Sequence, residues 1–202
     1  MDLFSSCGAL THVPIDDGEL YFLERLKVAG DAILPRLIEQ TAWRSESITV
    51  WGKRYLQPRL IAWHGSAAYR YSGMTLAPLP FTPLQLQIRE AVRQATGLTF
   101  NSVLLNYYRD GNDSMGFHSD DESELGPDPA IASVSFGAPR LFILKHKRLA
   151  KTIKIPLGNG SLLVMAGSTQ ANWKHGINKS RRPCGPRVNL TFRNIIQASK
   201  IC

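Results

Sequence analysis

The sequence predicts a mainly β fold with flanking helices, in which a jelly-roll-like core carries two N-terminal helices. Three observations predict it. Six short β-rich runs follow one another after residue 99, glycine and proline separate these runs, and both segments with helical periodicity come before residue 98. Many short strands with turn signals between them are typical of β-sandwiches and barrels.

The chain begins with a predicted strand and a predicted helix. Residues 19–23 follow an Asp-Asp-Gly turn and contain Leu, Tyr and Phe, which suit a strand. Apolar residues at helical spacing then predict a helix over 31–42. Asp31 is the expected N-cap, and Pro35 lies early enough to be tolerated.

The second predicted helix has clear signals at both ends. Thr82 can cap it, Pro83 suits the first helical position, and Gln85 completes a capping box. Gly97 fits the C-terminal stop. The apolar stripe consists of Leu84, Ile88 and Val92.

The remainder of the chain is predicted as strands. The β-rich runs are 100–108, 131–136, 140–146, 151–156, 160–166 and 187–196. No segment has the composition of a linker, so we expect one domain over residues 1–202. Residues 1–98 would form an N-terminal extension and residues 99–197 the jelly-roll core.

Composition excludes several classes of protein. Of the 202 residues, 44% are hydrophobic and 20% are charged, which excludes wholesale disorder, collagen and a coiled coil. The apolar runs are too short to span a bilayer, and the N-terminus lacks the features of a secretory signal. The three cysteines, Cys7, Cys184 and Cys202, have no metal-like or disulfide-like spacing. We therefore expect a monomer with free thiols in the cytoplasm, nucleoid or nucleus, not secreted and not bound to a membrane.

Charge is unevenly distributed. The 24 Lys and Arg residues outnumber the 16 acids, a net charge of +8, yet seven acids lie between Asp110 and Asp128. Solvated loops explain such clusters, and charge alone favours that interpretation. The alternative is a phosphate-binding rim around an acidic centre.

Residues 187–193 alternate strictly between polar and apolar. Side chains on a strand point to opposite faces in turn, so Arg187, Asn189, Thr191 and Arg193 share one face. A polar edge strand is the common explanation. If the face is enclosed, its two guanidiniums require anionic partners, and a small dicarboxylate would satisfy both. Asn106 and Tyr108 share a strand face in the same way and can donate hydrogen bonds to a carboxylate.

Two imidazoles and one carboxylate suggest a metal. His118 and Asp120 project from one face of an extended segment, and His175 could complete the set. Such a facial triad suits non-haem Fe(II) that activates oxygen. A lone His-x-Asp is a weak signal, and His12, His64 and His146 are interpreted as structural or surface residues.

Together these residues resemble the AlkB family of Fe(II)- and 2-oxoglutarate-dependent nucleic-acid dealkylases. The most specific match is the Arg-x-Asn-x-Thr-x-Arg signature at 187–193, and the resemblance extends over about residues 18–197. Residues 131–137 and 57–60 resemble the branch of the animal DNA-repair homologues. The resemblance implies a double-stranded β-helix core.

The resemblance also implies cofactors, ligands and a reaction. His118, Asp120 and His175 would hold Fe(II). Arg187 and Tyr108 would bind the distal carboxylate of 2-oxoglutarate, with Arg193, Asn106 and Asn189 near the other carboxylate. The reaction would consume O₂, convert 2-oxoglutarate to succinate and CO₂, and release an N-methyl group as formaldehyde. Bases of the N1-methyladenine and N3-methylcytosine type would be the substrates, in DNA and, as a further candidate, in RNA.

Substrate contacts follow from the same resemblance. Tyr71, in a nucleotide-recognition lid with Tyr69, would stack on a flipped base opposite His118, and Glu122 would read its exocyclic amino group. Trp51 would wedge into the vacated stack, although a core tryptophan is an equal alternative. The proposed phosphate rim comprises Lys53, Lys145, Lys147, Arg148, Lys179 and Arg181.

One departure affects strand preference. The connection between Lys147 and Lys154 is shorter than in the duplex-repair homologues, so single strands are expected to be accepted as well or better. Two rival functions remain: the same oxygenase chemistry on a non-nucleic-acid substrate, and a catalytically silent nucleic-acid-binding module.

Overall fold

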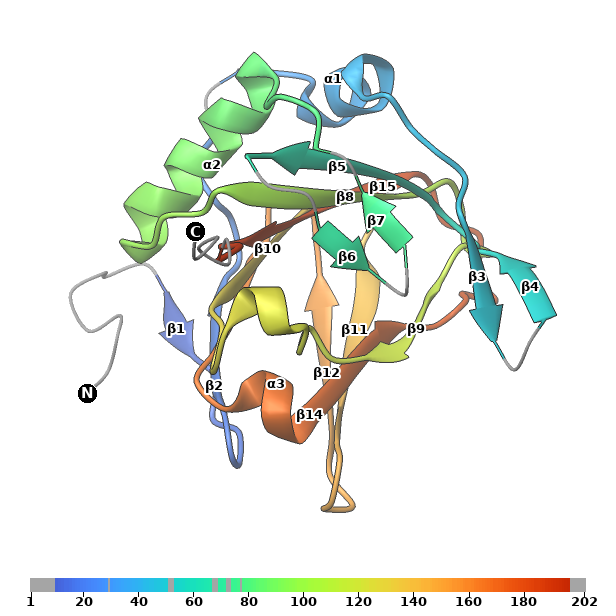
Figure 1. Ribbon diagram of the computed structural model, residues 1–202. Helices are drawn as coiled ribbons and strands as arrows, with labels where there is room; N and C mark the ends of the chain where they lie inside the picture. The colour runs from blue at the N-terminus through green and yellow to red at the C-terminus, as the bar shows by residue number, and fades with distance from the viewer. Residues whose placement is uncertain are drawn as a thin grey trace, which may run out of the picture.

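The computed structural model describes residues 10–196 except residues 29, 51–52, 67–68, 72–73 and 77. Within these residues, two antiparallel sheets form the body of the molecule (Figure 1). The larger has seven strands in the order β1-β2-β13-β10-β15-β8-β5, and the smaller has four in the order β12-β11-β14-β9. Jelly-roll topology of this kind was expected from the short strands separated by turns.

The strands of the larger sheet are Thr11–His12 (β1), Glu19–Leu23 (β2), Leu60–Gly65 (β5), Ser102–Tyr108 (β8), Ile131–Gly137 (β10), Leu162–Ala166 (β13) and Arg187–Arg193 (β15). Those of the smaller sheet are Met115–His118 (β9), Arg140–His146 (β11), Thr152–Leu157 (β12) and Trp173–Ile177 (β14). Two hairpins pair Ser47–Val50 (β3) with Lys53–Leu56 (β4) and Tyr69–Tyr71 (β6) with Met74–Leu76 (β7).

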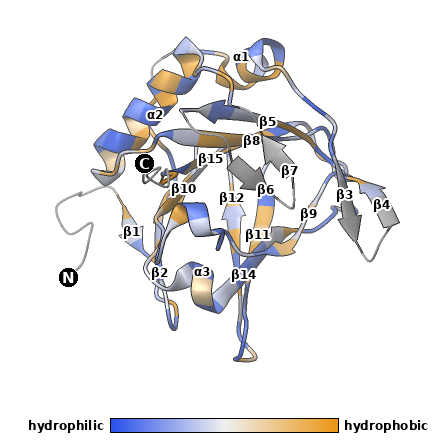
Figure 2. Cartoon of the chain, in the orientation of Figure 1, coloured by the Kyte–Doolittle hydropathy of each residue, from blue (hydrophilic) through white to orange (hydrophobic). Residues whose placement is uncertain are grey.

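Apolar side chains divide the molecule into layers. One buried cluster joins α1 (Ile33–Gln40) and α2 (Pro83–Thr96) to the larger sheet, and includes Leu37, Ile88 and Leu190. A second cluster lies between the two sheets and includes Leu104 and Trp173. Hydrophobic colours accordingly run along the central strands, while α2 carries hydrophobic and hydrophilic bands (Figure 2).

Strand β15 shows how this layering positions polar groups. Val188, Leu190 and Phe192 pack into the helix-side cluster. The other face carries the two arginines and turns toward the smaller sheet, and every residue of the strand is buried. The arginine face of this strand is therefore enclosed, so its two guanidiniums require anionic partners, as expected from the sequence.

The predicted ends of α2 are confirmed. Thr82 Oγ1 accepts a hydrogen bond from the backbone N–H of Gln85, and Gln85 Oε1 accepts one from the backbone N–H of Thr82. Gly97 has φ of +72°, the left-handed conformation that a glycine adopts without strain. Capping therefore fixes the helix that covers the outer face of the larger sheet.

The predicted cap of α1 is wrong. The helix begins at Ile33, and Ala32 precedes it with φ of +54° and no side-chain cap. A capping side chain needs an extended backbone at the residue before the helix, and Asp31 lies one residue too early for that role. The helix ends at Gln40, because Thr41 is extended.

Strand β15 ends at Arg193 rather than at residue 196. Beyond it, the side chain of Asn101 bonds both backbone groups of Ile195, at 2.8 Å each. This side-chain contact replaces the strand ladder. The short helix Thr169–Asn172 (α3) and the 3₁₀ turn Ser123–Leu125 complete the elements. None of the helices among the described residues is both long and apolar enough to cross a bilayer.

Candidate active site

A pocket between the two sheets collects the residues that the sequence singled out. All three predicted metal ligands and all five predicted dicarboxylate contacts line it: His118, Asp120, His175, Asn106, Tyr108, Arg187, Asn189 and Arg193. They come from β8, β9, β14, β15 and the segment after β9. Residues far apart in the sequence thus meet at one site.

A β-bulge aims the edge strand at this pocket. His118 and His175 are cross-strand partners, and the next pair is Met115 with Ile177. Two residues of β9 therefore stand opposite the single residue Gly176. Because a bulge re-aims side chains, Met115 and His118 both line the pocket although they are three residues apart.

The ring of His118 is oriented for a metal. Nδ1 of His118 lies 2.9 Å from the carbonyl oxygen of Gly116. A carbonyl only accepts hydrogen bonds, so this contact places the proton on Nδ1 and the lone pair on Nε2. The two rings lie edge to face with centroids 4.5 Å apart, and the ring of Phe142 stacks on His175.

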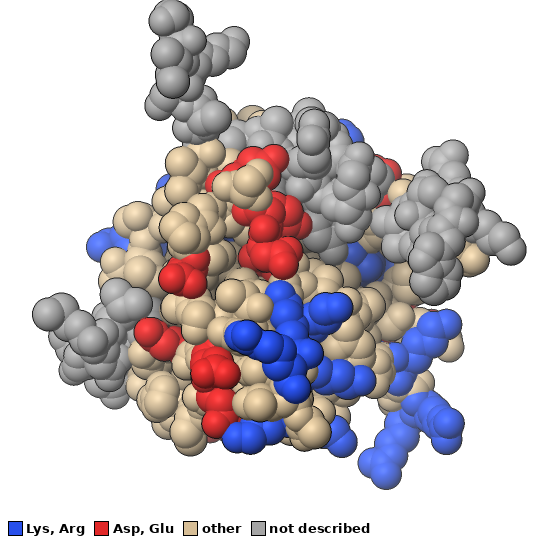
Figure 3. Space-filling model, turned by 60° about the horizontal axis from the view of Figure 1, so that its bottom comes forward, with Lys and Arg blue, Asp and Glu red and all other residues tan. Residues whose placement is uncertain are grey.

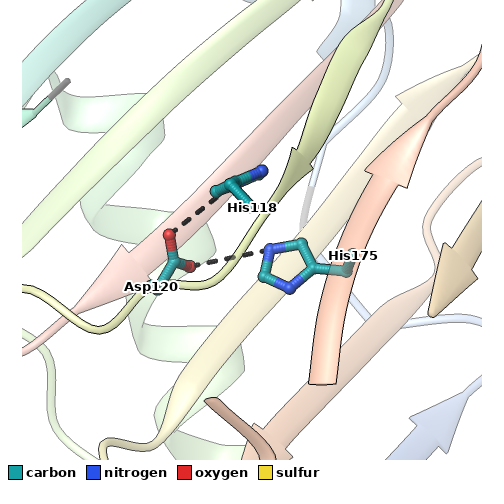
Figure 4. A group of neighbouring side chains, drawn as sticks. All are labelled: His118, Asp120 and His175. Atoms are coloured by element: carbon teal, nitrogen blue, oxygen red, sulfur yellow. Dashed lines mark ion pairs between the residues drawn. The ribbon is translucent and has the colours of Figure 1, made fainter. Parts of the chain in front are cut away.

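Asp120 is fully buried and its two oxygens have different surroundings. Oδ1 accepts a hydrogen bond from Arg193 Nη2 at 2.9 Å, and the backbone N–H of Asp120 donates to Gln170 Oε1. Oδ2 lies 4.0 Å from Nε2 of His175 and is buried with no hydrogen-bond partner among the described residues. Figure 4 shows both histidines beside this carboxylate. Arg193 therefore holds one oxygen and leaves the other for a further ligand.

Electrostatics keeps these groups in the ionisation states that bind metals. Burial alone would raise the pKa of Asp120, but the charges of Arg193, His175 and His118 outweigh burial and lower the pKa to about 2. Burial, followed by the charge of His118, lowers the pKa of His175 to about 3. At neutral pH the site thus offers a carboxylate and a neutral imidazole, the forms that ligate a metal.

The three side chains fit a divalent cation. One nitrogen or oxygen atom from each of His118, Asp120 and His175 lies within 4.8 Å of the others. No described residue provides a hydrogen-bond partner for the buried Oδ2 of Asp120, and a bound metal would interact with this oxygen instead. Two imidazoles and one carboxylate on one side of a metal leave coordination positions open for other ligands.

Arg187 is a buried cation that needs an anion. Its side chain is 1% exposed, its Nη2 donates to Ser135 Oγ at 2.9 Å, and its guanidinium carbon lies 5.0 Å from the ring centroid of Tyr108. Nε and Nη1 are buried without a hydrogen-bond partner among the described residues. Burial lowers the pKa of this arginine, which reflects the cost of an uncompensated charge. A carboxylate from outside the chain would remove that cost.

The comparisons with known proteins decide the family. The model of the 2OG-Fe(II) oxygenase superfamily matches residues 26–193. The chain belongs to the 2OG-Fe(II) oxygenase superfamily. Within it, the chain is 42% identical over 181 residues to rat (Rattus norvegicus) alpha-ketoglutarate-dependent dioxygenase alkB homolog 3, covering 82% of this chain and 60% of that protein.

Other relatives place the chain among the AlkB homologues. It is 41% identical over 187 residues to the human (Homo sapiens) DNA oxidative demethylase ALKBH2, covering 86% of this chain and 72% of that protein. The chain thus spans about 60% of the length of the homolog 3 proteins it resembles. The solved structure titled "The structure of OsALKBH1" has a TM-score of 0.64 at 16% identity, covers 91% of this chain and all of that chain, and supports the fold.

Two buried arginines to which the sequence assigned no role support the surroundings of the pocket. Arg59 is buried, and its Nε donates to Asn106 Oδ1 at 2.8 Å, so the amide nitrogen of Asn106 is the group left to face a ligand. Arg140 donates to three backbone carbonyls, of Asp110, Asp113 and Asn178. It braces the loop beyond Tyr108. Both contacts join distant segments, and no local pattern in the sequence indicates them.

Asn189 is occupied by its own chain. Its amide nitrogen donates to Ser133 Oγ and to the carbonyl of Val134, and its Oδ1 accepts from Thr191. With both donors and the oxygen engaged, Asn189 contributes to the wall of the pocket. The sequence did not indicate these partners, and the role of Asn189 in binding 2-oxoglutarate stays a prediction.

The predicted base contacts fall partly outside the described structure. Trp51 lies outside the described residues. Tyr69 and Tyr71 lie in β6, and Lys53 in β4, with side chains that are not described. Glu122 immediately precedes the 3₁₀ turn and is half-buried two residues from Asp120.

The predicted phosphate rim does not form one group. Lys147 donates to the carbonyl of Gln170 and pairs with Asp121, and Arg148 donates to Asn172 Oδ1. Lys179 and Arg181 are exposed beyond β14. Lys145 lies on the outer face of the smaller sheet. Only part of the rim is therefore available to phosphate without breaking contacts within the chain.

Proposed function

We propose that this chain is an Fe(II)- and 2-oxoglutarate-dependent dioxygenase that removes N-linked methyl groups from bases in DNA or RNA, and thereby repairs alkylation damage. One observation carries the proposal: a His-Asp-His cluster lines the same pocket as Arg187, a buried arginine for which the described residues provide no acidic partner. The names of the relatives, alpha-ketoglutarate-dependent dioxygenase and DNA oxidative demethylase, support the substrate class.

The residues divide the work of binding. His118, Asp120 and His175 would hold Fe(II), which with 2-oxoglutarate and O₂ supplies the oxidising chemistry when bound. Arg187 would bind the distal carboxylate of 2-oxoglutarate, because two nitrogens of this buried cation, Nε and Nη1, have no hydrogen-bond partner among the described residues. The amide nitrogen of Asn106, oriented by Arg59, would donate to the other carboxylate.

Arg193 would control the carboxylate ligand. It engages Oδ1 of Asp120 and keeps this group ionised, so that Oδ2 faces the metal. The apolar surroundings from Phe142, Met165 and Ile177 would exclude water from the reacting centre.

The base contacts complete the proposal. A methylated base must leave the stack before its methyl group can reach the pocket. The carboxylate of Glu122, close to the metal ligands in sequence, would suit a cationic base such as N1-methyladenine or N3-methylcytosine. Tyr69, Tyr71 and Trp51 keep their proposed roles in stacking and wedging. We further propose that the enzyme acts as a monomer in the cytoplasm, nucleoid or nucleus.

The test is direct. The protein is incubated with Fe(II), ascorbate, 2-oxoglutarate and a single-stranded oligonucleotide bearing one N1-methyladenine, and the oligonucleotide is weighed by mass spectrometry. The expected result is loss of the methyl group that requires 2-oxoglutarate and is abolished in Asp120→Ala. Succinate without demethylation would indicate a different substrate. If iron-loaded protein forms neither succinate nor demethylated oligonucleotide, the result favours the binding-module alternative.

A further inference from the structure

The outer face of the smaller sheet is basic and contains no acid. Strands β9, β11, β12 and β14 include no Asp or Glu. Lys145, Lys154 and Lys174 are exposed on three of these strands, while neighbouring residues such as His175 and Leu144 are buried on the inner face. Figure 3, which brings the bottom of Figure 1 forward, shows a group of Lys and Arg residues with acidic residues along its border.

The arrangement of these lysines is electrostatically unfavourable in the isolated protein. Lys145 and Lys174 are direct cross-strand partners, and like charges in that position destabilise a sheet. Neither they nor Lys154 form an ion pair within the described part of the chain. By contrast, Lys147 and Lys151 in the β11–β12 connection pair with Asp121 and Asp16. An external polyanion would relieve the repulsion on the sheet face.

An aromatic ring links this face to the pocket. The β9 bulge turns Phe117 outward, where Lys145 Nζ lies 4.1 Å from its ring centroid. The next residue is His118, which lines the pocket and whose side chain is 24% exposed. The aromatic ring and the predicted metal ligand therefore lie on opposite faces of the same edge strand, one peptide bond apart.

We propose that the outer face of the β12-β11-β14-β9 sheet, from Phe117 to Lys154, binds the single-stranded nucleic acid that flanks the base in the pocket. A base would stack on Phe117 after the strand passes around the β9 edge, and Lys145, Lys154 and Lys174 would contact phosphates. Aromatic rings beside a cationic track are what single-strand binders use. The inference rests on the proposed function for its substrate class.

A single strand fits this face better than a duplex. The β11–β12 connection consists of residues 147–151 only, and two of its lysines are paired with acids of the same chain. That connection therefore offers little to hold a second strand. The lysines on β11, β12 and β14 form one basic surface, which suits a single nucleic-acid backbone.

The experiment measures binding of unmodified nucleic acid by fluorescence anisotropy over a range of salt. The Lys154→Glu/Lys174→Glu variant is compared with Arg25→Glu/Lys27→Glu, which changes net charge equally on the exposed segment after β2. For a 20-nucleotide strand we expect the sheet variant to lose affinity on the order of tenfold. The slope of log affinity against log salt should fall by about 1.4, which corresponds to two phosphate contacts on a single strand. A 5-nucleotide strand should lose much less.

Three results would overturn the inference: equal losses for the 5- and 20-nucleotide strands, an equal loss in the control variant, or a larger loss for a 20-base-pair duplex. Phe117→Leu should also weaken the 20-nucleotide complex, with little change in the salt slope, because stacking is not ionic. Demethylation of a 5-nucleotide substrate by the unmodified enzyme is measured separately. Its failure would count against the proposed function, whereas the binding comparison tests the sheet face independently.

Discussion

Arg187 and Arg193 stand at the two ends of β15, on the same face, and each side chain is almost fully buried, yet they have different partners. Arg193 has a carboxylate of its own chain, Asp120, at 2.9 Å. Arg187 contacts the hydroxyl of Ser135 and the ring of Tyr108, and two of its nitrogens have no hydrogen-bond partner within the described part of the chain. The sequence pattern treats the two as equivalent, but the structure does not. Arg193 supports the predicted metal ligand Asp120, whereas Arg187 is free to bind an anion from outside the chain.

Removing Arg193 should have the largest effect on stability. Arg193→Gln leaves the buried carboxylate of Asp120 without its cation, and such losses cost about 3–5 kcal/mol. Urea denaturation of the metal-free protein measures the change. Arg187→Gln is the matched control and should remain close to the unmodified protein, because it leaves no charge behind. Equal destabilisation by the two variants would contradict the distinction.

The same ion pair should make stability depend on acid. The pKa of Asp120 is about 2 when folded and 3.8 when unfolded, so the unfolded chain binds the proton more readily. The stabilisation is present above pH 3.8 and is lost as pH falls toward 2, a change of about 2 kcal/mol. Urea denaturation of metal-free Asp120→Asn, between pH 5 and the acid limit of folding, should show a shallower decline. If the stability of Asp120→Asn declined as steeply as that of the unmodified protein, the acid sensitivity would come from groups other than Asp120.

A third arginine, Arg59, is expected to affect 2-oxoglutarate binding by orienting the side-chain amide of Asn106. In Arg59→Gln the oxygen of Asn106 loses its donor, so the amide is no longer held with its nitrogen toward the ligand. We expect KM for 2-oxoglutarate to rise about three- to tenfold with little change in kcat, as one hydrogen bond of about 1 kcal/mol would give. Steady-state kinetics of succinate formation measures both constants. Adding Asn106→Ala to Arg59→Gln should cause little further loss, and full additivity would contradict the link.

The smallest effect concerns the outer face of the sheet. Lys174→Glu converts a like-charge cross-strand pair into an opposite one and leaves the Lys145–Phe117 contact intact. The free energy of unfolding should rise by about 0.2–1 kcal/mol. Thermal denaturation at low and high salt measures it, and the gain should shrink with salt because the groups are exposed. A loss of stability would show that the opposed lysines do not repel.

Much of the fold could be predicted because the relevant signals are local. Alternation over 187–193 and the capping box at Thr82 each depend on a few neighbouring residues, and both are confirmed. The Asp31 cap failed because Ala32, in a left-handed conformation, occupies the position before the helix. Strand β5, the hairpin strands β3, β4, β6 and β7, and the edge strand β9 were not among the predicted strands, and all of these except β5 have only three or four residues.

The sequence predicted which residues form the site but not which of them contact one another. The spacing of His118, Asp120 and His175 indicated a metal set, and the structure brings them together. The Asp120–Arg193 and Arg59–Asn106 contacts join segments 73 and 47 residues apart, and a single sequence contains no signal for such pairs. The sequence therefore suggested that both arginines of the strand need an external anion, whereas among the described residues Arg193 already pairs with Asp120 and Arg187 has no acidic partner.

The most direct test of this distinction removes the anion from the ligand. 2-Oxopentanoate is 2-oxoglutarate with a methyl group in place of the distal carboxylate. Calorimetric titration of the metal-loaded, oxygen-free protein compares both compounds in the unmodified enzyme and in Arg187→Gln. We predict that the unmodified enzyme prefers 2-oxoglutarate by about 10- to 100-fold, as hydrogen bonds to a charged group would give, and that Arg187→Gln abolishes the preference. Undiminished discrimination in Arg187→Gln would contradict the assignment of Arg187 to the distal carboxylate.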